Sequence, residues 1–166
     1  MDKNTSVFSD EVFNLWFLLH MTRDAIHRAR ERELEQYGIS APQSAVLFFI
    51  QAISESGKDV TPAEISRWFF REANSINGIL NRMEKAGLIT KSKDLHKKNL
   101  VRVAMTPKGR QVYQQTIKRE ALRNTLAKAL TSEQRHQLWE LLSALRDGAL
   151  KECGIDYALP FPPPKP

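Results

Sequence analysis

The stretch from Thr61 to Thr106 restricts the possible folds of this chain more than any other feature. It begins with the helix-capping pattern Thr-Pro-Ala-Glu, in which proline takes the first helical position, where its missing N–H costs nothing. A second helical segment runs from Glu72 to Lys85 and ends before Gly87. Two strand-like segments follow, Leu88–Thr90 and Leu100–Met105. This order predicts two helices joined by a tight turn, followed by a β-hairpin.

The second of these helices has two different faces. At about 100° per residue, its apolar residues gather on one side, as in a helix that packs on a core; they are Ile76, Ile79, Leu80 and Met83. The opposite side carries no carboxylate and consists of Asn74, Ser75, Asn77, Gly78, Asn81 and Arg82. Asn and Ser form helices less readily than Ala, so something other than helix propensity favours them here. Base edges in the major groove are one explanation, since Asn can bind adenine and Arg can bind guanine or a phosphate. A polar face that merely contacts water is the alternative.

Positive charge is concentrated directly after this helix. From Arg82 to Arg110 there are nine Lys or Arg residues and two acidic residues, a net charge of +7. The whole chain carries +6, so the remainder sums to −1. Charge gathered beside a polar helix is the electrostatic pattern of a phosphate-binding surface. Together with the order of elements, it predicts a winged helix-turn-helix that binds duplex DNA, with a basic wing loop at Lys91–Asn99.

Three segments resemble the MarR family of bacterial transcriptional regulators: Thr61–Phe70, Asn81–Leu88, and Asp94 together with Thr106–Gly109. The resemblance implies a homodimeric winged-helix repressor or activator. It also implies that the helix carrying Asn77 reads DNA and that Asp94 is the wing aspartate. Many members of this family respond to small phenolic or other aromatic ligands or to oxidants.

The wing differs from the family pattern at one position. The family usually has an arginine two residues after the wing aspartate, where it enters the minor groove, and here that residue is His96. A neutral histidine is a poorer minor-groove ligand than arginine, so Lys97 or Lys98 would have to substitute, or minor-groove readout is weak. The complete set of predicted DNA contacts is Asn74, Ser75, Asn77, Gly78, Asn81, Arg82, Lys91, Lys93, Asp94, His96, Lys97 and Lys98.

The flanking segments predict long helices suited to dimerisation. The first runs from an N-cap at Ser9 to Tyr37, and at about 1.5 Å per residue it would span roughly 43 Å, too long for a small core to cover. In the C-terminal third, one apolar helix begins at Thr106-Pro107 and continues to Leu126, and another begins at a capping box at Thr131. We expect a C2 homodimer whose recognition helices meet half-sites of a pseudo-palindromic operator about 34–36 Å apart. A monomeric bundle that closes on itself is the alternative.

The fold class expected is therefore mainly α with a small β-hairpin wing. Residues 1–38 would form the N-terminal dimerisation helix, 39–106 the winged helix-turn-helix lobe, 107–159 the C-terminal dimerisation helices and 160–166 a proline-rich tail, all within one continuous unit. The tail is compatible with disorder, with packing on the dimer, or with binding to an aromatic groove of a partner.

No segment indicates catalysis or a cofactor. The chain has no Gly-rich phosphate loop and no nucleophile motif, and its four histidines have no recognisable metal spacing. Cys153 is the single cysteine, far from the start of the first helix, where oxidant-sensing members of the family carry theirs. The sequence lacks a membrane-length apolar run and a signal peptide, so a cytoplasmic location is expected.

The nature of a regulatory signal is the least constrained part of the prediction. In the family the effector cleft lies between the dimerisation helices and the DNA-binding lobe, which implies a small aromatic effector near Trp16, His20, Arg23 and Trp68. Two functions remain open. One is a dimeric DNA-binding regulator, more readily a repressor, and the other is a winged-helix module for protein–protein contact. The concentrated positive charge favours DNA.

Overall fold

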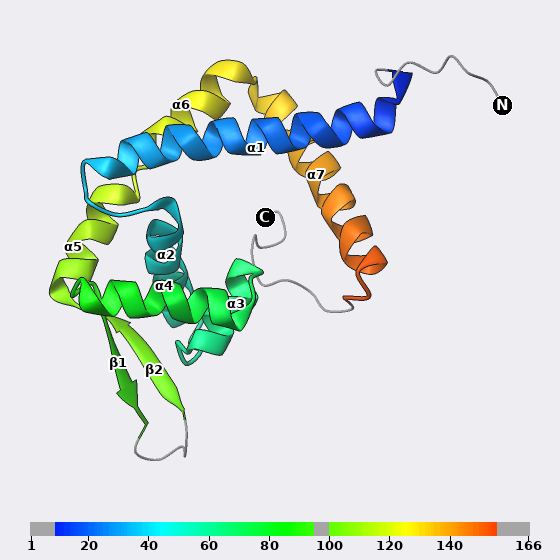
Figure 1. Ribbon diagram of the computed structural model, residues 1–166. Coiled ribbons are helices and arrows are strands. Elements are labelled where there is room, and N and C mark those ends of the chain that lie inside the picture. Colours follow the sequence, from blue (N-terminus) through cyan, green and yellow to red (C-terminus); the bar gives the residue numbers. More distant parts are fainter. Residues whose placement is uncertain (1–8, 95–99, 156–166) are drawn as a thin grey trace.

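The computed structural model describes residues 9–94 and 100–155. Within these residues it contains helices and one two-stranded antiparallel sheet (Figure 1), which confirms the predicted class of mainly α with a β-hairpin. In chain order the elements are α1 Glu11–Glu35, α2 Ala41–Glu55, α3 Pro62–Phe69, α4 Ala73–Lys85, β1 Ile89–Lys93, β2 Val101–Met105, α5 Pro107–Thr116, α6 Glu120–Ala129 and α7 Ser132–Glu152.

The starts of the helices follow local capping signals. Ser40 and Thr131 each accept a hydrogen bond from the third residue of their helix, whose glutamine side chain bonds back, so both capping boxes are complete. The box predicted at Thr61 is only half made: Thr61 Oγ1 accepts from the N–H of Glu64 at 3.1 Å, but the Glu64 carboxylate instead accepts from Trp68, Arg67 and Lys58. The first helix begins one residue later than expected, with Asp10 rather than Ser9 as its N-cap.

The core lies around α2, which is buried along most of one side. Val46, Leu47 and Ile53 are completely buried there. The inner faces of α3 and α4 close on them, through Ile65 and the four apolar α4 residues named above, all of them buried. Burial of this apolar surface fixes α4 against α2 and α3, so the polar face of α4 points away from the protein.

The hairpin pairs Ile89 with Met105 and continues in register to Lys93 and Val101. Its first strand extends three residues beyond the expected end at Thr90, so Lys91 and Lys93 lie on β1 rather than in a loop. Figure 1 shows the hairpin projecting from the lobe beyond one end of α4.

The helix expected from Pro107 to Leu126 is broken in two. Arg119 adopts a left-handed backbone with φ of 52°, and α5 and α6 meet there at an angle. No side chain of the α6 N-terminus caps it, but Glu33 on α1 accepts hydrogen bonds from the N–H groups of Glu120 and Ala121, at 2.8 and 3.3 Å. A cap supplied by a distant helix compensates for the unfavourable residue.

Large apolar side chains remain exposed on α1 and α7. The exposed set comprises Val12, Phe13, Leu15, Trp16, Phe17, Leu18 and Met21 on α1, with Trp139, Leu141, Leu142 and Leu145 on α7. On α1 these residues occupy all sides of the helix, which is the pattern of a helix surrounded by protein. The other described residues do not bury these side chains, whereas the C-terminal part of α1 is covered and its Arg30 and Leu34 are buried.

Candidate nucleic-acid interface

The polar face of α4 is available to a ligand. Asn74, Ser75, Asn77, Asn81 and Arg82 are exposed and Gly78 is half-buried, whereas the opposite face of the helix is buried. The N-cap residue of the helix is Glu72, whose side chain makes no capping hydrogen bond. The structure therefore brings all six α4 residues of the predicted set onto one outward face.

Gly78 makes no tight packing contact with the described residues. A Cβ atom built on it would meet only the end of the Arg82 side chain, at 3.7 Å, which is an ordinary van der Waals contact. Glycine destabilises a helix interior by about 0.5–1 kcal/mol relative to alanine. No packing contact with the described residues compensates for this loss, and the role of Gly78 in close approach to DNA stays a prediction.

Lys91, in the middle of β1, connects the hairpin to α4. Its Nζ lies 2.8 Å from Glu84 Oε2 and donates to Asn81 Oδ1 at 2.6 Å, while its backbone N–H donates to Glu84 Oε1 at 3.1 Å. The hydrogen bond and positive charge of Lys91 lower the pKa of Glu84, so this carboxylate is ionised at neutral pH. Asn81 and Lys91, both predicted DNA contacts, are thus bonded to one another in the unliganded chain.

Asp94 anchors the far end of the hairpin. It accepts from Arg102 Nε at 2.7 Å, and the other side of the same guanidinium contacts Asp59, just before α3. The Asp94 side chain is only 9% exposed, so it supports the hairpin from within. The backbone N–H of Asp94 donates to Leu100 O at 2.8 Å and continues the ladder beyond the strands.

Several predicted contacts fall in or near the hairpin end. Lys93 is exposed on β1 and forms no ion pair with other described residues. His96, Lys97 and Lys98 lie outside the described residues, so their assignment stays a prediction. Glu84 and Arg102 also belong to this surface but were not predicted from the sequence. The ion-pair partners of their side chains depend on hairpin register and on the loop before α3.

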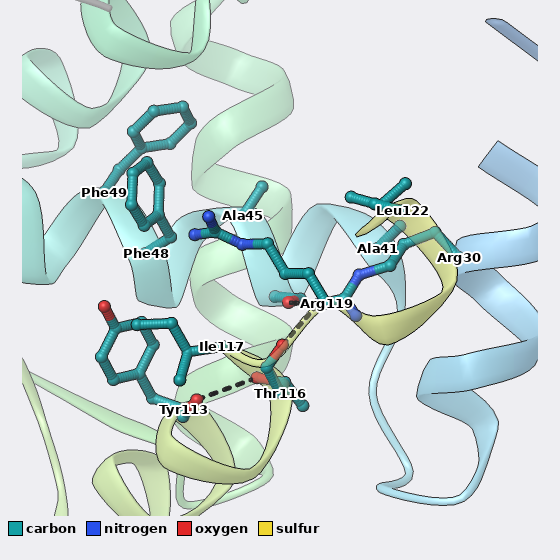
Figure 2. Close-up of a pocket in the computed structure, with 11 residues that line it drawn as sticks. Arg30, Ala41, Ala45, Phe48, Phe49, Tyr113, Thr116, Ile117, Arg119 and Leu122 are labelled. Atoms are coloured by element: carbon teal, nitrogen blue, oxygen red, sulfur yellow. Dashed lines mark hydrogen bonds between the residues drawn. The ribbon is translucent and has the colours of Figure 1, made fainter. Parts of the chain in front are cut away.

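A pocket of about 300 Å³ lies on the other side of the lobe, between α1, α2, α5 and α6. Figure 2 shows the Arg119 side chain extending across it, with its guanidinium 4.6 Å from the centre of the Phe48 ring. Burial is the main cause that raises the pKa of Tyr113, so its phenol keeps its proton at neutral pH. The lining residues are Arg30, Ala41, Ser44, Ala45, Phe48, Phe49, Tyr113, Thr116, Ile117, Arg119 and Leu122.

The four residues predicted to contact an effector do not line this pocket. Trp16, His20 and Arg23 lie on the exposed half of α1, where the Trp16 and His20 rings are 4.5 Å apart. Trp68 lies on α3, bonded to Glu64, with its ring 6.2 Å from that of Phe49, which does line the pocket. The assignment of these four to an effector site stays a prediction. No local pattern marked the pocket residues, which come from four helices and from the link between α5 and α6.

Comparison with known proteins identifies the lobe. Residues 39–109 match the family model described as a winged helix DNA-binding domain. The uncharacterized HTH-type transcriptional regulator YsmB of Bacillus subtilis (strain 168) is 30% identical over 112 residues, which cover 66% of this chain and 74% of YsmB. The chain belongs to the MarR family of winged helix-turn-helix transcriptional regulators.

Solved structures of transcriptional regulators share the fold along most of this chain. The organohalide-sensing regulator RdhR-CbdbA1625, determined with 2,4-dichlorophenol bound, has a TM-score of 0.76 and 29% identity, with 90% of this chain and 89% of that one covered. A mutant of MarR from E. coli in complex with operator DNA has a TM-score of 0.75 and 24% identity, with 85% and 99% covered, and shows the shared fold. MepR from S. aureus bound to DNA has a TM-score of 0.73 and 20% identity, with 84% and 99% covered.

Membership of the MarR family makes this protein a DNA-binding transcriptional regulator, and its relatives are regulators rather than enzymes. The β1–β2 hairpin is the wing and α4 is the recognition helix of the family fold. Across residues 9–94 and 100–155, no helix has the length and apolarity required to cross a membrane. The same residues contain no group of three His, Cys, Asp or Glu side chains suited to a metal, and Cys153 is exposed.

Proposed function

We propose that this protein is a homodimeric, sequence-specific repressor that binds a pseudo-palindromic operator and is released by a small aromatic effector. The observation that carries the proposal is the outward face of α4, polar and without carboxylates, backed by a fully buried apolar face. Residues 39–106 would form the DNA-binding lobe, and 1–38 and 107–159 the dimerisation helices. A regulator of chromosomal genes would act in the cytoplasm.

Selection of bound fragments from genomic DNA tests the central claim. We expect a pseudo-palindromic site, and affinity for it should fall steeply with salt because each phosphate contact releases counterions. Replacing Asn77 with Ala should relax sequence preference at one position of each half-site by about 1–3 kcal/mol. A flat salt dependence would contradict DNA binding and favour the protein-contact alternative.

The exposed apolar residues of α1 and α7 support the homodimer. Leu141 is 69% exposed and Leu145 is 51% exposed, so neither stabilises the single chain to a large degree. We expect sedimentation to give twice the chain mass for the wild type, and Leu141→Glu to shift the population to monomers. Gln137→Glu, which introduces the same charge at an exposed position of α7, is the control. A monomeric wild type would contradict the dimer.

The pocket beside Arg119 supports release by an effector. Its volume lies at the lower end of the range for small-molecule sites, and its walls combine aromatic rings with two arginines and a phenol. The related RdhR-CbdbA1625 was determined with 2,4-dichlorophenol, which is a suitable probe. A ligand acts only through different affinities for the DNA-bound and free conformations. We therefore expect the probe to raise the Kd for the operator, and Phe48→Leu to weaken this response. An unchanged Kd at saturating probe would exclude this compound as an effector.

Repression is distinguished from activation in cells. A promoter that contains the selected operator should become more active when the protein is deleted. Lower promoter activity on deletion would indicate an activator.

A further inference from the structure

We propose that Glu84 is a positioning residue for DNA binding, which sets the angle between the recognition helix and the wing by holding Lys91 at two points. The inference rests on the proposed sequence-specific binding. One carboxylate oxygen accepts the backbone N–H of Lys91 at 3.1 Å, and the other lies 2.8 Å from its ammonium. Two attachments from one side chain restrict both the distance and the direction of β1 relative to α4.

Both strands of the wing are hydrogen-bonded to the lobe at the same position along the hairpin. Lys91 is paired with Val103, and in an antiparallel ladder the N–H groups of such a pair can both point away from the partner strand. That of Lys91 donates to Glu84, and that of Val103 donates to Val60 O at 2.9 Å, in the loop before α3. Glu84 supplies the attachment on the α4 side. Without it, the backbone of the wing would be bonded to the lobe only on the α3 side at this level, and the Lys91 ammonium would keep only its bond to Asn81 on α4.

Electrostatics alone would disfavour an acidic residue at this position. Glu84 lies on the recognition helix, its side chain is 40% exposed, and it would repel approaching phosphates. Lys91 offsets this charge, but it is thereby removed from contact with DNA. A carboxylate and a lysine that neutralise each other add little to phosphate binding, so the arrangement is better explained by position than by charge.

The same lysine also orients a predicted base contact. Lys91 Nζ donates to Asn81 Oδ1 at 2.6 Å, which turns the amide oxygen towards the wing. The Asn81 NH₂ group is then left as the donor for other partners. Glu84 thus positions Asn81 indirectly, through Lys91.

The test compares binding to two probes: the duplex selected by the wild type from genomic fragments, and mixed-sequence duplex. Glu84→Ala should bind the selected duplex about five- to tenfold more weakly, since the cost of ordering the wing is moved to the binding step. Its affinity for mixed-sequence duplex should be equal or higher, because a negative charge has been removed. Glu72→Ala is the matched control, as it removes a carboxylate from the start of the same helix where no cap is formed.

Two further variants distinguish the positioning role of Glu84 from an effect of its charge or of lost folding. Glu84→Gln keeps an acceptor for the Lys91 N–H and should retain the ratio of selected to mixed affinity. Lys91→Ala keeps its backbone N–H bond to Glu84 but loses the ammonium that orients Asn81. Its ratio should therefore fall less than that of Glu84→Ala, while affinity for both probes falls. Hydroxyl-radical footprints should show weaker wing protection for Glu84→Ala only. Thermal unfolding ensures that every comparison is made with folded protein.

The inference is overturned if Glu84→Ala raises affinity for both probes by the same factor as Glu72→Ala. Loss of the ratio in Lys91→Ala but not in Glu84→Ala would also overturn it, because the ammonium would then be the important group. Equal binding of both probes by the wild type would instead contradict sequence-specific binding itself.

Discussion

Arg30 on α1 donates a hydrogen bond from Nη2 to the carbonyl oxygen of Thr116, the last residue of α5, at 2.8 Å. The same nitrogen donates to Ser44 Oγ on α2 at 3.1 Å, and Nη1 lies 2.7 Å from Glu33, which caps α6. Arg30, Ser44 and Thr116 are the buried polar or charged residues of the described chain, and all three belong to this network. It connects α1 to the lobe and to the helices that follow it.

We expect Arg30→Ala to lower the free energy of unfolding by about 3–5 kcal/mol, because removal of one partner leaves Glu33 and the Thr116 carbonyl without their buried donor. Urea unfolding measures this change. Arg32→Ala, at an exposed position two residues further along the same helix, should change stability by less than about 0.5 kcal/mol. Similar losses for both variants would contradict a role for the network.

Two glycine substitutions should have opposite effects on stability. Gly78→Ala should stabilise the protein by about 0.5–1 kcal/mol, since the added Cβ meets no close atom. Gly109→Ala should destabilise it by about 1–3 kcal/mol, because the Cβ would lie 2.0 Å from Leu88 O and force the backbone to move. Thermal and urea unfolding measure the stability of both variants. A stabilised Gly109→Ala would show that the contact between the added Cβ and Leu88 O relaxes easily.

The stabilised Gly78→Ala variant should bind its operator less tightly, because the extra methyl group occupies the outward face of α4. A loss of about tenfold corresponds to 1.4 kcal/mol. Fluorescence anisotropy with the selected duplex measures it. Unchanged affinity would mean that DNA does not approach this residue closely.

Stability should fall with acid partly through Glu64. Burial alone would raise the pKa of this carboxyl, but the hydrogen bond from Trp68 and the charges of Arg67 and Lys58 outweigh it and hold the pKa below the usual 4.5. A lowered folded pKa means that the contribution is present above about pH 5 and is lost as pH falls through the folded value. Glu64→Gln should therefore flatten the decline of unfolding free energy between about pH 5 and pH 3. The exposed Glu152→Gln is the control, and parallel curves for all three proteins would contradict the expectation.

Arg102→Lys should loosen the far end of the wing while keeping the charge. One guanidinium contacts Asp94 and Asp59 on different sides, and a single ammonium cannot reproduce that geometry. Because Arg102 is 41% exposed, we expect the loss of stability to be small and confined to the wing. Amide exchange at Asp94 should become faster and that of Leu80 in the core should not. Equal acceleration at both would indicate global destabilisation instead.

The elements predicted correctly from the sequence depend on interactions between near neighbours. Thr131 caps its helix because its partner lies three residues away, and the buried face of α4 follows from a repeat of three and four residues. Such signals are contained in any short window of the chain. The break at Arg119 is not, because its stabilisation comes from Glu33, 87 residues from the Glu120 N–H that it accepts.

The sequence by itself determined where most helices begin, which face of α4 is polar, and where the positive charge is concentrated. Only the tertiary structure decided which of those charged side chains form ion pairs within the protein: Lys91 pairs with Glu84, and Arg102 contacts both Asp94 and Asp59. It also decided that Phe48 and Arg119 share a pocket. The physical reason is that composition and periodicity constrain local conformation, whereas ion pairs and pockets depend on distances between segments that only packing brings together.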